Sequence, residues 1–185
     1  MVIDFIIIIF FVYFVIVGFR RGFWLSMIHL SATIVSLWIA SQFYKSIVER
    51  LIVFIPYPKT TAFNTTFAFH FNHLQNRFEA IVAFLMITLF CKFILYLIIV
   101  TFDKIIAYQN IHIFSRAMGM IVGVFMTIIV LHFTLYLLAL YPNEALQHQL
   151  KISIVSHSLI FHIPYLSAFT INLYIIIRGQ DKGIY

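Results

Sequence analysis

The fold is decided by two apolar runs near the N-terminus and by the short motif between them. Residues 3–40 read IDFIIIIFFVYFVIVGFRRGFWLSMIHLSATIVSLWIA. The runs over 3–19 and 23–40 each reach the length, roughly 17 to 25 residues, that crosses the hydrocarbon core of a bilayer as a helix. The motif GFRRGF at 18–23 leaves almost no loop between them. The pattern predicts a tight transmembrane hairpin.

The residues of this motif divide into two kinds. Gly18 and Gly22 can adopt the positive φ values that a tight reversal needs. Arg20 and Arg21 cannot lie in hydrocarbon, so they hold the turn at the lipid headgroups. A reversal does not in itself require two arginines. Two interpretations therefore stay open: a turn that only reverses the chain, or a contact with anionic lipid or a partner protein.

Two further apolar runs, over 80–102 and 117–140, have the length of membrane spans. Between the second and third spans, residues 41–78 mix phenylalanines with charged and polar residues, which is typical of a segment on the membrane surface. Residues 143–177 begin with a helical apolar period, with Asn143 as N-cap, and Pro164 breaks that helix. This segment is predicted to be amphipathic.

Composition places the whole chain in the membrane class. Of its 185 residues, 63% are hydrophobic and 10% are charged, and the mean hydropathy is +1.04. A soluble domain has about a quarter of its residues charged. The expected fold is an all-α integral membrane protein with about four transmembrane helices plus interfacial amphipathic segments, in one domain over 1–185.

The net charge of +6 does not indicate a nucleic-acid partner, because the twelve lysines and arginines are scattered at the ends of apolar runs. A nucleic-acid binder gathers them on one polar face. The lipid bilayer is the expected partner, together with other membrane proteins or further copies of the chain. Counting basic residues on the two sides of four spans favours termini on the cytoplasmic side.

No catalytic constellation is visible in the sequence. Asp4, Asp103 and Asp181 lie at run ends or in the tail, so no pair of carboxylates is expected inside the membrane. The strings His-Glu-x-x-His and Gly-x-Ser-x-Gly are both absent. We therefore expect no enzyme, no catalytic residues and no cofactor.

The eight histidines do not form a convincing metal site either. His70 and His73 could share a helix face, whereas His157 and His162 are expected to face differently. Zinc needs three or four ligands, and cysteine or acidic partners are missing nearby. Interfacial histidines with hydrated tips are expected instead.

Lys92 is the unusual charge, because it falls near the middle of the predicted span over 80–102. At 1.5 Å per residue it lies roughly 18 Å from either end, which snorkelling covers only in part. An ionisable group at that depth is a functional hypothesis by default. The alternative is a tilted helix, or one lying against a hydrated cavity or a partner.

Gly119 and Gly123 lie four residues apart and place two small residues on one face of the fourth span. Small faces let membrane helices approach each other closely. The face can serve packing within the four-helix unit, or it can form a dimer or partner interface.

With these features, the chain resembles the colicin V production protein family, known as CvpA. The resemblance covers nearly the whole length. It rests on Asp4, the GFRRGF hairpin, Ala40 at the end of the second run and the pattern Arg116-x-x-Gly119-x-x-x-Gly123. The tracts IPYP at 55–58 and HIPYL at 162–166 look like the Gram-positive branch of that family. Lys92 is not a family feature, so no family role transfers to it.

The resemblance implies a small multi-pass protein of the bacterial plasma (inner) membrane, linked to production or export of a peptide toxin or bacteriocin and to envelope homeostasis. It implies no mechanism. The favoured hypothesis is a non-enzymatic accessory protein whose hairpin arginines and segments 41–78 and 143–177 bind partners or lipids. The rival is a small oligomeric transporter or channel subunit, motivated by Lys92 and by the small face around Gly119.

Overall fold

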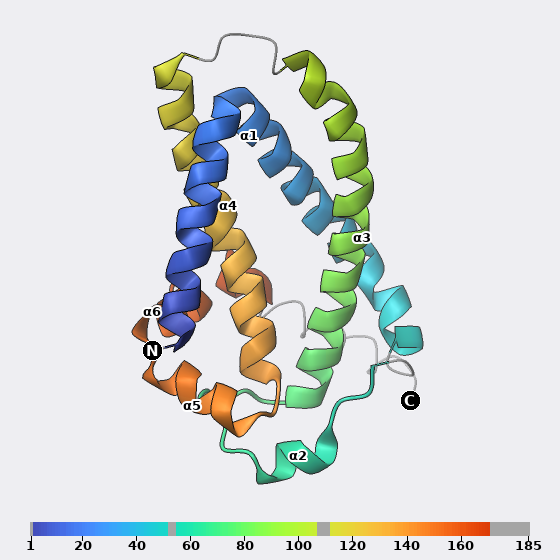
Figure 1. Ribbon diagram of the computed structural model, residues 1–185. Coiled ribbons are helices and arrows are strands. Elements are labelled where there is room, and N and C mark those ends of the chain that lie inside the picture. Colours follow the sequence, from blue (N-terminus) through green and yellow to red (C-terminus); the bar gives the residue numbers. More distant parts are fainter. Residues whose placement is uncertain (1, 52–54, 107–111, 171–185) are drawn as a thin grey trace.

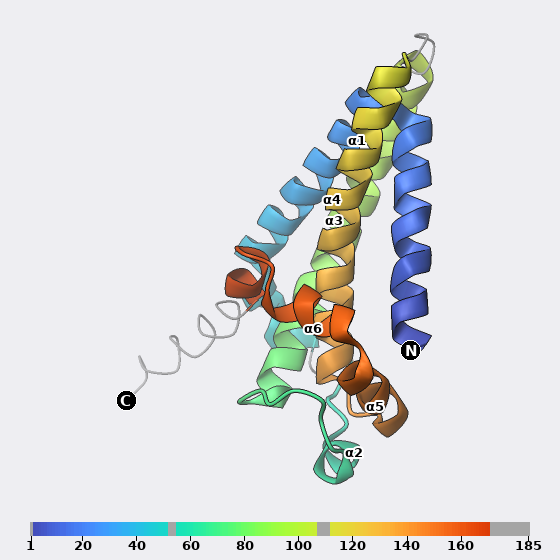
Figure 2. The ribbon, with the colours of Figure 1, turned by 90° about the vertical axis from the view of Figure 1, so that its left-hand side faces the viewer.

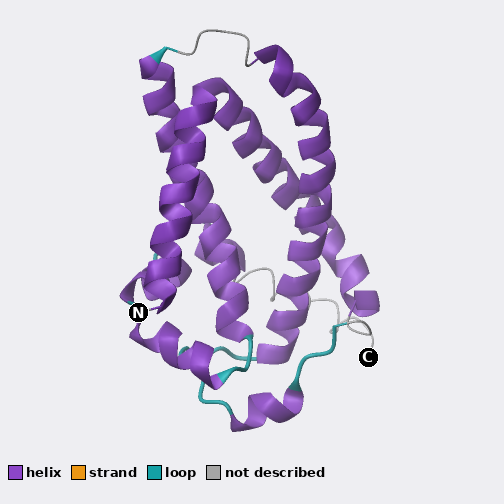
Figure 3. Cartoon of the chain, in the orientation of Figure 1, coloured by secondary structure: helices purple, strands orange, loops and turns teal. Residues whose placement is uncertain are grey.

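The predicted hairpin is present, and it lies within α1. A computed structural model describes residues 2–51, 55–106 and 112–170, and every regular element in these ranges is a helix (Figure 3). Helix α1 spans Val2–Leu51, 50 residues, which would measure about 75 Å if straight. The hydrocarbon core is only about 30 Å thick. Figure 1 shows how α1 resolves this mismatch: the chain rises from the N-terminus, reverses and descends.

The reversal takes place at one residue, Gly22, whose φ is 72° and ψ is 179°. This region of backbone space is essentially restricted to glycine. Gly18 was expected to share the positive φ, but among the described glycines only Gly22 has one. Gly18 continues the helix and serves another purpose, described below.

Replacing Gly22 with alanine is expected to lower the free energy of unfolding by about 1–3 kcal/mol, because a Cβ is strained in this conformation. Thermal unfolding in detergent measures the effect. Alanine at Ile121, which is 50% exposed on α4, is the matched control. Equal losses of stability in both variants would contradict a role for the Gly22 backbone.

Two long helices complete the bundle: α3, Leu74–Ile106, and α4, Ile113–Leu140. Three helices are long and apolar enough to cross a membrane, over Val2–Val48, Leu74–Thr101 and Ile113–Leu140. Because α1 reverses at Gly22, it forms a first apolar arm before that glycine and a second arm after it. With α3 and α4, the chain therefore has four apolar arms. The predicted all-α membrane fold is confirmed.

The helices exceed the predicted spans at several ends. The second arm of α1 continues beyond Ala40 to Leu51, and α3 begins at Leu74. Much of the segment 41–78 is therefore helical, and it also contains the short helix α2, Lys59–Asn64. Its position at the membrane surface stays a prediction.

The C-terminal segment was expected to start as one amphipathic helix ended by Pro164, and this is corrected. It forms α5, Glu144–Ile152, and α6, Ile154–Phe161. Ser153 separates them, because its backbone is extended and its hydroxyl accepts a hydrogen bond from the Ser156 amide at 3.1 Å. The N-cap is confirmed, since the Asn143 side chain accepts from the Leu146 amide at 3.1 Å. Residues 171–177 lie outside the described residues.

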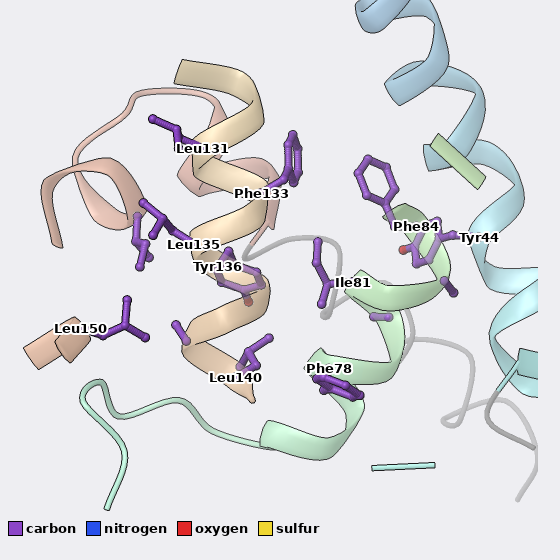
Figure 4. Close-up of a cluster of buried hydrophobic side chains, with 14 of the residues drawn as sticks. Tyr44, Phe78, Ile81, Phe84, Leu131, Phe133, Leu135, Tyr136, Leu140 and Leu150 are labelled. Carbon is purple, nitrogen blue, oxygen red and sulfur yellow. The ribbon is translucent and has the colours of Figure 1, made fainter. Parts of the chain in front are cut away.

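Buried apolar side chains gather at the end of the bundle where the N-terminus, α2 and α5 lie (Figures 1 and 4). The cluster draws on α1, α3, α4, α5 and α6, and its labelled members in Figure 4 are Tyr44, Phe78, Ile81, Phe84, Leu131, Phe133, Leu135, Tyr136, Leu140 and Leu150. Elsewhere large apolar side chains face outward, such as Ile8 at 59% and Leu89 at 67% exposure. Such a surface is the expected boundary with lipid.

Two buried polar atoms at this core have no hydrogen-bond partner among the described residues: the hydroxyl of Tyr57 and Nε2 of His132, whose ring stacks on Tyr136. Tyr57 is 8% exposed and its ring packs on Phe78 with centroids 5.3 Å apart. Burial raises the pKa of the Tyr57 phenol. The ring therefore stabilises the core while its hydroxyl costs desolvation free energy.

Replacing Tyr57 with phenylalanine is expected to raise the free energy of unfolding by about 1 kcal/mol, because it removes the unsatisfied hydroxyl and keeps the ring. Chemical or thermal unfolding checks this. Replacing Tyr57 with alanine should instead lower stability by about 3 kcal/mol. A destabilising phenylalanine variant would show that the hydroxyl has a partner.

Candidate functional site at the hairpin turn

The hairpin is packed against α4 through glycine. A Cβ at Gly119 would lie less than 3.0 Å from backbone atoms of Gly18 and Gly22, and one at Gly18 would meet the Gly119 carbonyl equally closely. A Cβ at Gly123 would lie 2.5 Å from the Phe14 carbonyl oxygen. The small face of α4 is thus filled by α1. Of the two interpretations left open, packing within the chain is the one that the structure supports.

Two side chains at the start of α4 also hold the turn. The Ser115 hydroxyl accepts a hydrogen bond from the Phe23 amide at 3.1 Å, which caps the first turn of the second arm. The Arg116 guanidinium lies over the Phe19 ring, 5.8 Å from its centroid. The motif at 18–23 and the pattern from Arg116 to Gly123 therefore form one structural unit, which we call the hairpin junction.

The two arginines of the turn have different surroundings. Arg20 is exposed, and so are Trp24 at 71% and Phe19 at 39%. Arg21 is half-buried and lines a cleft of about 40 Å³ between the arms of α1 and α4. Sequence reasoning treated the pair as equivalent, because the direction of each side chain depends on the packing of three segments distant in sequence.

Lys92 does not face lipid alone. Its ammonium donates hydrogen bonds of 2.6 Å to the His29 carbonyl and 2.6 Å to the Thr33 hydroxyl, both on the second arm of α1. Neither acceptor is an acidic side chain, since one is a backbone carbonyl and the other is a hydroxyl, so the sequence did not indicate them as partners of Lys92. Lys92 is half-buried at this contact between α3 and α1.

His29 and Thr33 belong to a buried polar face that sequence reasoning missed. Its members are 5–6% exposed or fully buried and recur every three or four residues: Ser26, His29, Thr33 and Ser36. The run over 23–40 was interpreted from the sequence only as apolar, and these residues were not separated from it. Their helical spacing, which places them on one face, was the available signal. This face packs toward α3 and α4 and carries both Lys92 contacts.

The histidines are arranged differently from expectation. His70 and His73 precede α3, so they do not share a helix face. The rings of His157 and His162, expected to face differently, lie 5.4 Å apart because the chain leaves the helix at His162. Among the described residues, no group of three or more histidine, cysteine or acidic side chains could hold a metal ion.

A second polar centre ties the opposite end of the bundle together. Gln147 is 1% exposed, and its amide accepts a hydrogen bond from the Ala68 amide at 3.0 Å. The same amide donates to the Tyr141 carbonyl at 2.8 Å and to two carbonyls in the last turn of α4. Nearby, Asp4 accepts a hydrogen bond of 2.5 Å from the Ser153 hydroxyl. Figure 2 shows α5 and α6 beside the lower end of α4, where these contacts occur.

The fold and the hairpin junction define an all-helical membrane protein whose N-terminal hairpin is packed on α4 through glycines. A family model described as Colicin V production protein matches residues 3–164, which include the whole junction. The chain belongs to the colicin V production protein family. It is 30% identical over 153 residues to a Bacillus subtilis (strain 168) protein described as the uncharacterized transmembrane protein YshB, with 82% of this chain and 85% of the relative covered. No solved structure matches the chain.

Proposed function

We propose that the chain is a non-enzymatic accessory protein of the bacterial plasma membrane that acts by binding other membrane proteins. Its process would be the production or export of a peptide toxin, together with envelope homeostasis, in keeping with its family. It would cross the membrane several times through the four apolar arms. The hairpin turn would carry the contact, with the segments around α2, α5 and α6 as a second surface.

The supporting observation is that some residues of the hairpin turn pack on α4, whereas Arg20 does not. Four contacts to α4 occupy Gly18, Gly22, Phe19 and the Phe23 amide, and these explain the shape of the turn. None of them uses Arg20, which is exposed, and Trp24 in the same turn is exposed as well. Arginine and tryptophan are the residue types enriched at interaction hot spots.

A photoreactive amino acid at position 24 tests this proposal in cells. We expect crosslinks to specific membrane proteins, identified by mass spectrometry, and their loss when Arg20 is replaced with alanine. Alanine at Arg50, an exposed arginine at the other end of the second arm, is the matched control. Crosslinks to lipid alone, or partners unaffected by Arg20→Ala, would contradict the proposal.

A small transporter or channel subunit is the second candidate, and one observation favours it. The buried polar face from Ser26 to Ser36 meets Lys92 of α3, and Thr33 of that face also contacts the Met126 sulfur of α4. The small face of α4 does not support an oligomer, because α1 covers it. Reconstituted chain that conducts ions or solutes, and loses that flux on Lys92→Met, would support this reading. No flux, or flux independent of Lys92, would exclude it.

A further inference from the structure

The cleft beside the hairpin turn concentrates positive charge. Arg21 lines it together with Ser26 and the 5% exposed His29. Lys92 donates to the His29 carbonyl, so a second cation lies against the same wall. Among the described residues, neither cation is in ion-pair contact with an acidic side chain.

With the arginine turn at the lipid headgroups, as the sequence predicts, the cleft would lie close to their level. His29 follows the turn at Gly22 by seven residues, or about 10 Å along a helix. The Lys92 ammonium lies 2.6 Å from the His29 carbonyl oxygen, so it is at about the same depth as His29. Its distance from the arginine turn is therefore shorter than the roughly 18 Å that separates Lys92 from the ends of its own span. Phosphate groups of the adjacent leaflet lie within reach of Arg21 at this depth.

Charged groups withdrawn from water are normally paired, and neither Arg21 in the cleft nor Lys92 beside its His29 wall has an acidic partner among the described residues. An ammonium has three donors, and the described contacts of Lys92 use two. The guanidinium of Arg21 offers the planar donor fork that matches phosphate. A cleft of about 40 Å³ admits a group the size of a few water molecules, such as one end of a phosphate, with the remainder outside.

We infer that this cleft binds a phosphate group, held by Arg21 with Lys92 behind it, as carried by an anionic lipid headgroup or free in solution. This inference rests on the proposed role of the hairpin as a contact surface and makes it specific: Arg20 would meet protein partners and Arg21 would hold the anion. Bound phosphate would also draw the arms of α1 and α4 together, because the cleft lies between them.

The test uses the full chain in an uncharged maltoside detergent, which carries no phosphate. Binding is measured by native mass spectrometry and by the shift in melting temperature with added phosphatidylglycerol, diacylglycerol of the same chains, or inorganic phosphate. We expect phosphatidylglycerol to bind at least about tenfold more tightly than diacylglycerol. Stabilisation by inorganic phosphate as well would identify a site open to free anions, whereas stabilisation by the lipid alone would identify a headgroup site.

Three variants distinguish anion binding in the cleft from a general effect of surface charge. Arg21→Gln should weaken binding about tenfold, and Arg20→Gln, which makes the same charge change at the same turn, should leave it unchanged. Arg21→Lys should bind with intermediate affinity. This variant shows whether the weaker binding of Arg21→Gln reflects the lost charge or misfolding. Without anion, Arg21→Gln should melt no lower than the unaltered chain, because it removes an uncompensated charge.

Equal effects of Arg20→Gln and Arg21→Gln, or equal binding of diacylglycerol and phosphatidylglycerol, would overturn the inference. So would an Arg21→Gln chain that melts lower without anion and still binds the lipid normally. These outcomes leave the partner crosslinks of Arg20 untouched, so failure of the phosphate site and failure of the proposed function are distinguishable.

Discussion

Replacing Gly119 with valine is expected to separate the hairpin from α4 and to lower the free energy of unfolding by about 3 kcal/mol or more. The new side chain would meet backbone atoms of Gly18 and Gly22 at less than 3.0 Å. Backbone in two packed helices cannot rotate away as a flexible side chain can. The hairpin would have to move as a unit, and the Ser115 bond to the Phe23 amide would break with it.

Thermal unfolding in detergent measures the loss, and alanine at Gly119 should give a smaller loss of the same kind. Valine at Ile121 is the control, since that residue lies on the same helix and is 50% exposed. If Gly119→Val unfolds normally but abolishes self-association, the small face of α4 is an oligomer interface. That result would reject the packing described for the hairpin junction.

The fold could be predicted from the sequence because its main determinants are local. Apolar runs of membrane length and a motif with glycine and paired arginine lie within a single stretch, 3–40. The positive φ of Gly22 follows from the same stretch, since a reversal without a loop needs one such residue. The break at Ser153 was missed because a serine can cap a new helix or sit inside an existing one, and only the cap contact decides.

The candidate site could be predicted only in part, because its contacts join residues far apart in the chain. Gly119 and Gly123 were identified as a small face, but the partner that fills it is Gly18 with its neighbours, about a hundred residues earlier. Lys92 was identified as unusual, yet its acceptors on α1 carry no charge. The different roles of Arg20 and Arg21 depend on how three helices meet at the turn.

Replacing Gln147 with leucine is expected to lower the free energy of unfolding by about 3 kcal/mol, although leucine has nearly the same volume. The Gln147 amide is 1% exposed and satisfies carbonyls at the end of α4, where a helix leaves acceptors without intrahelical partners. It also accepts from the Ala68 amide, which joins the segment before α3 to α5. Leucine would leave several buried polar groups without partners at once.

Gln147→Leu should loosen the segment around Ala68 as well as lower the stability of the whole chain. The local effect distinguishes lost hydrogen bonds from altered packing. Trypsin should cleave faster after Lys59 and Arg77, because the segment between them would lose its tie to α5. Leucine at the exposed neighbour His148 is the control and should change neither stability nor cleavage. Unchanged cleavage in a destabilised Gln147→Leu chain would show that the amide matters to the end of α4 but does not anchor the segment around Ala68. Because the hairpin junction lies at the other end of the bundle, the loss should also add to that of Gly119→Val in the double variant.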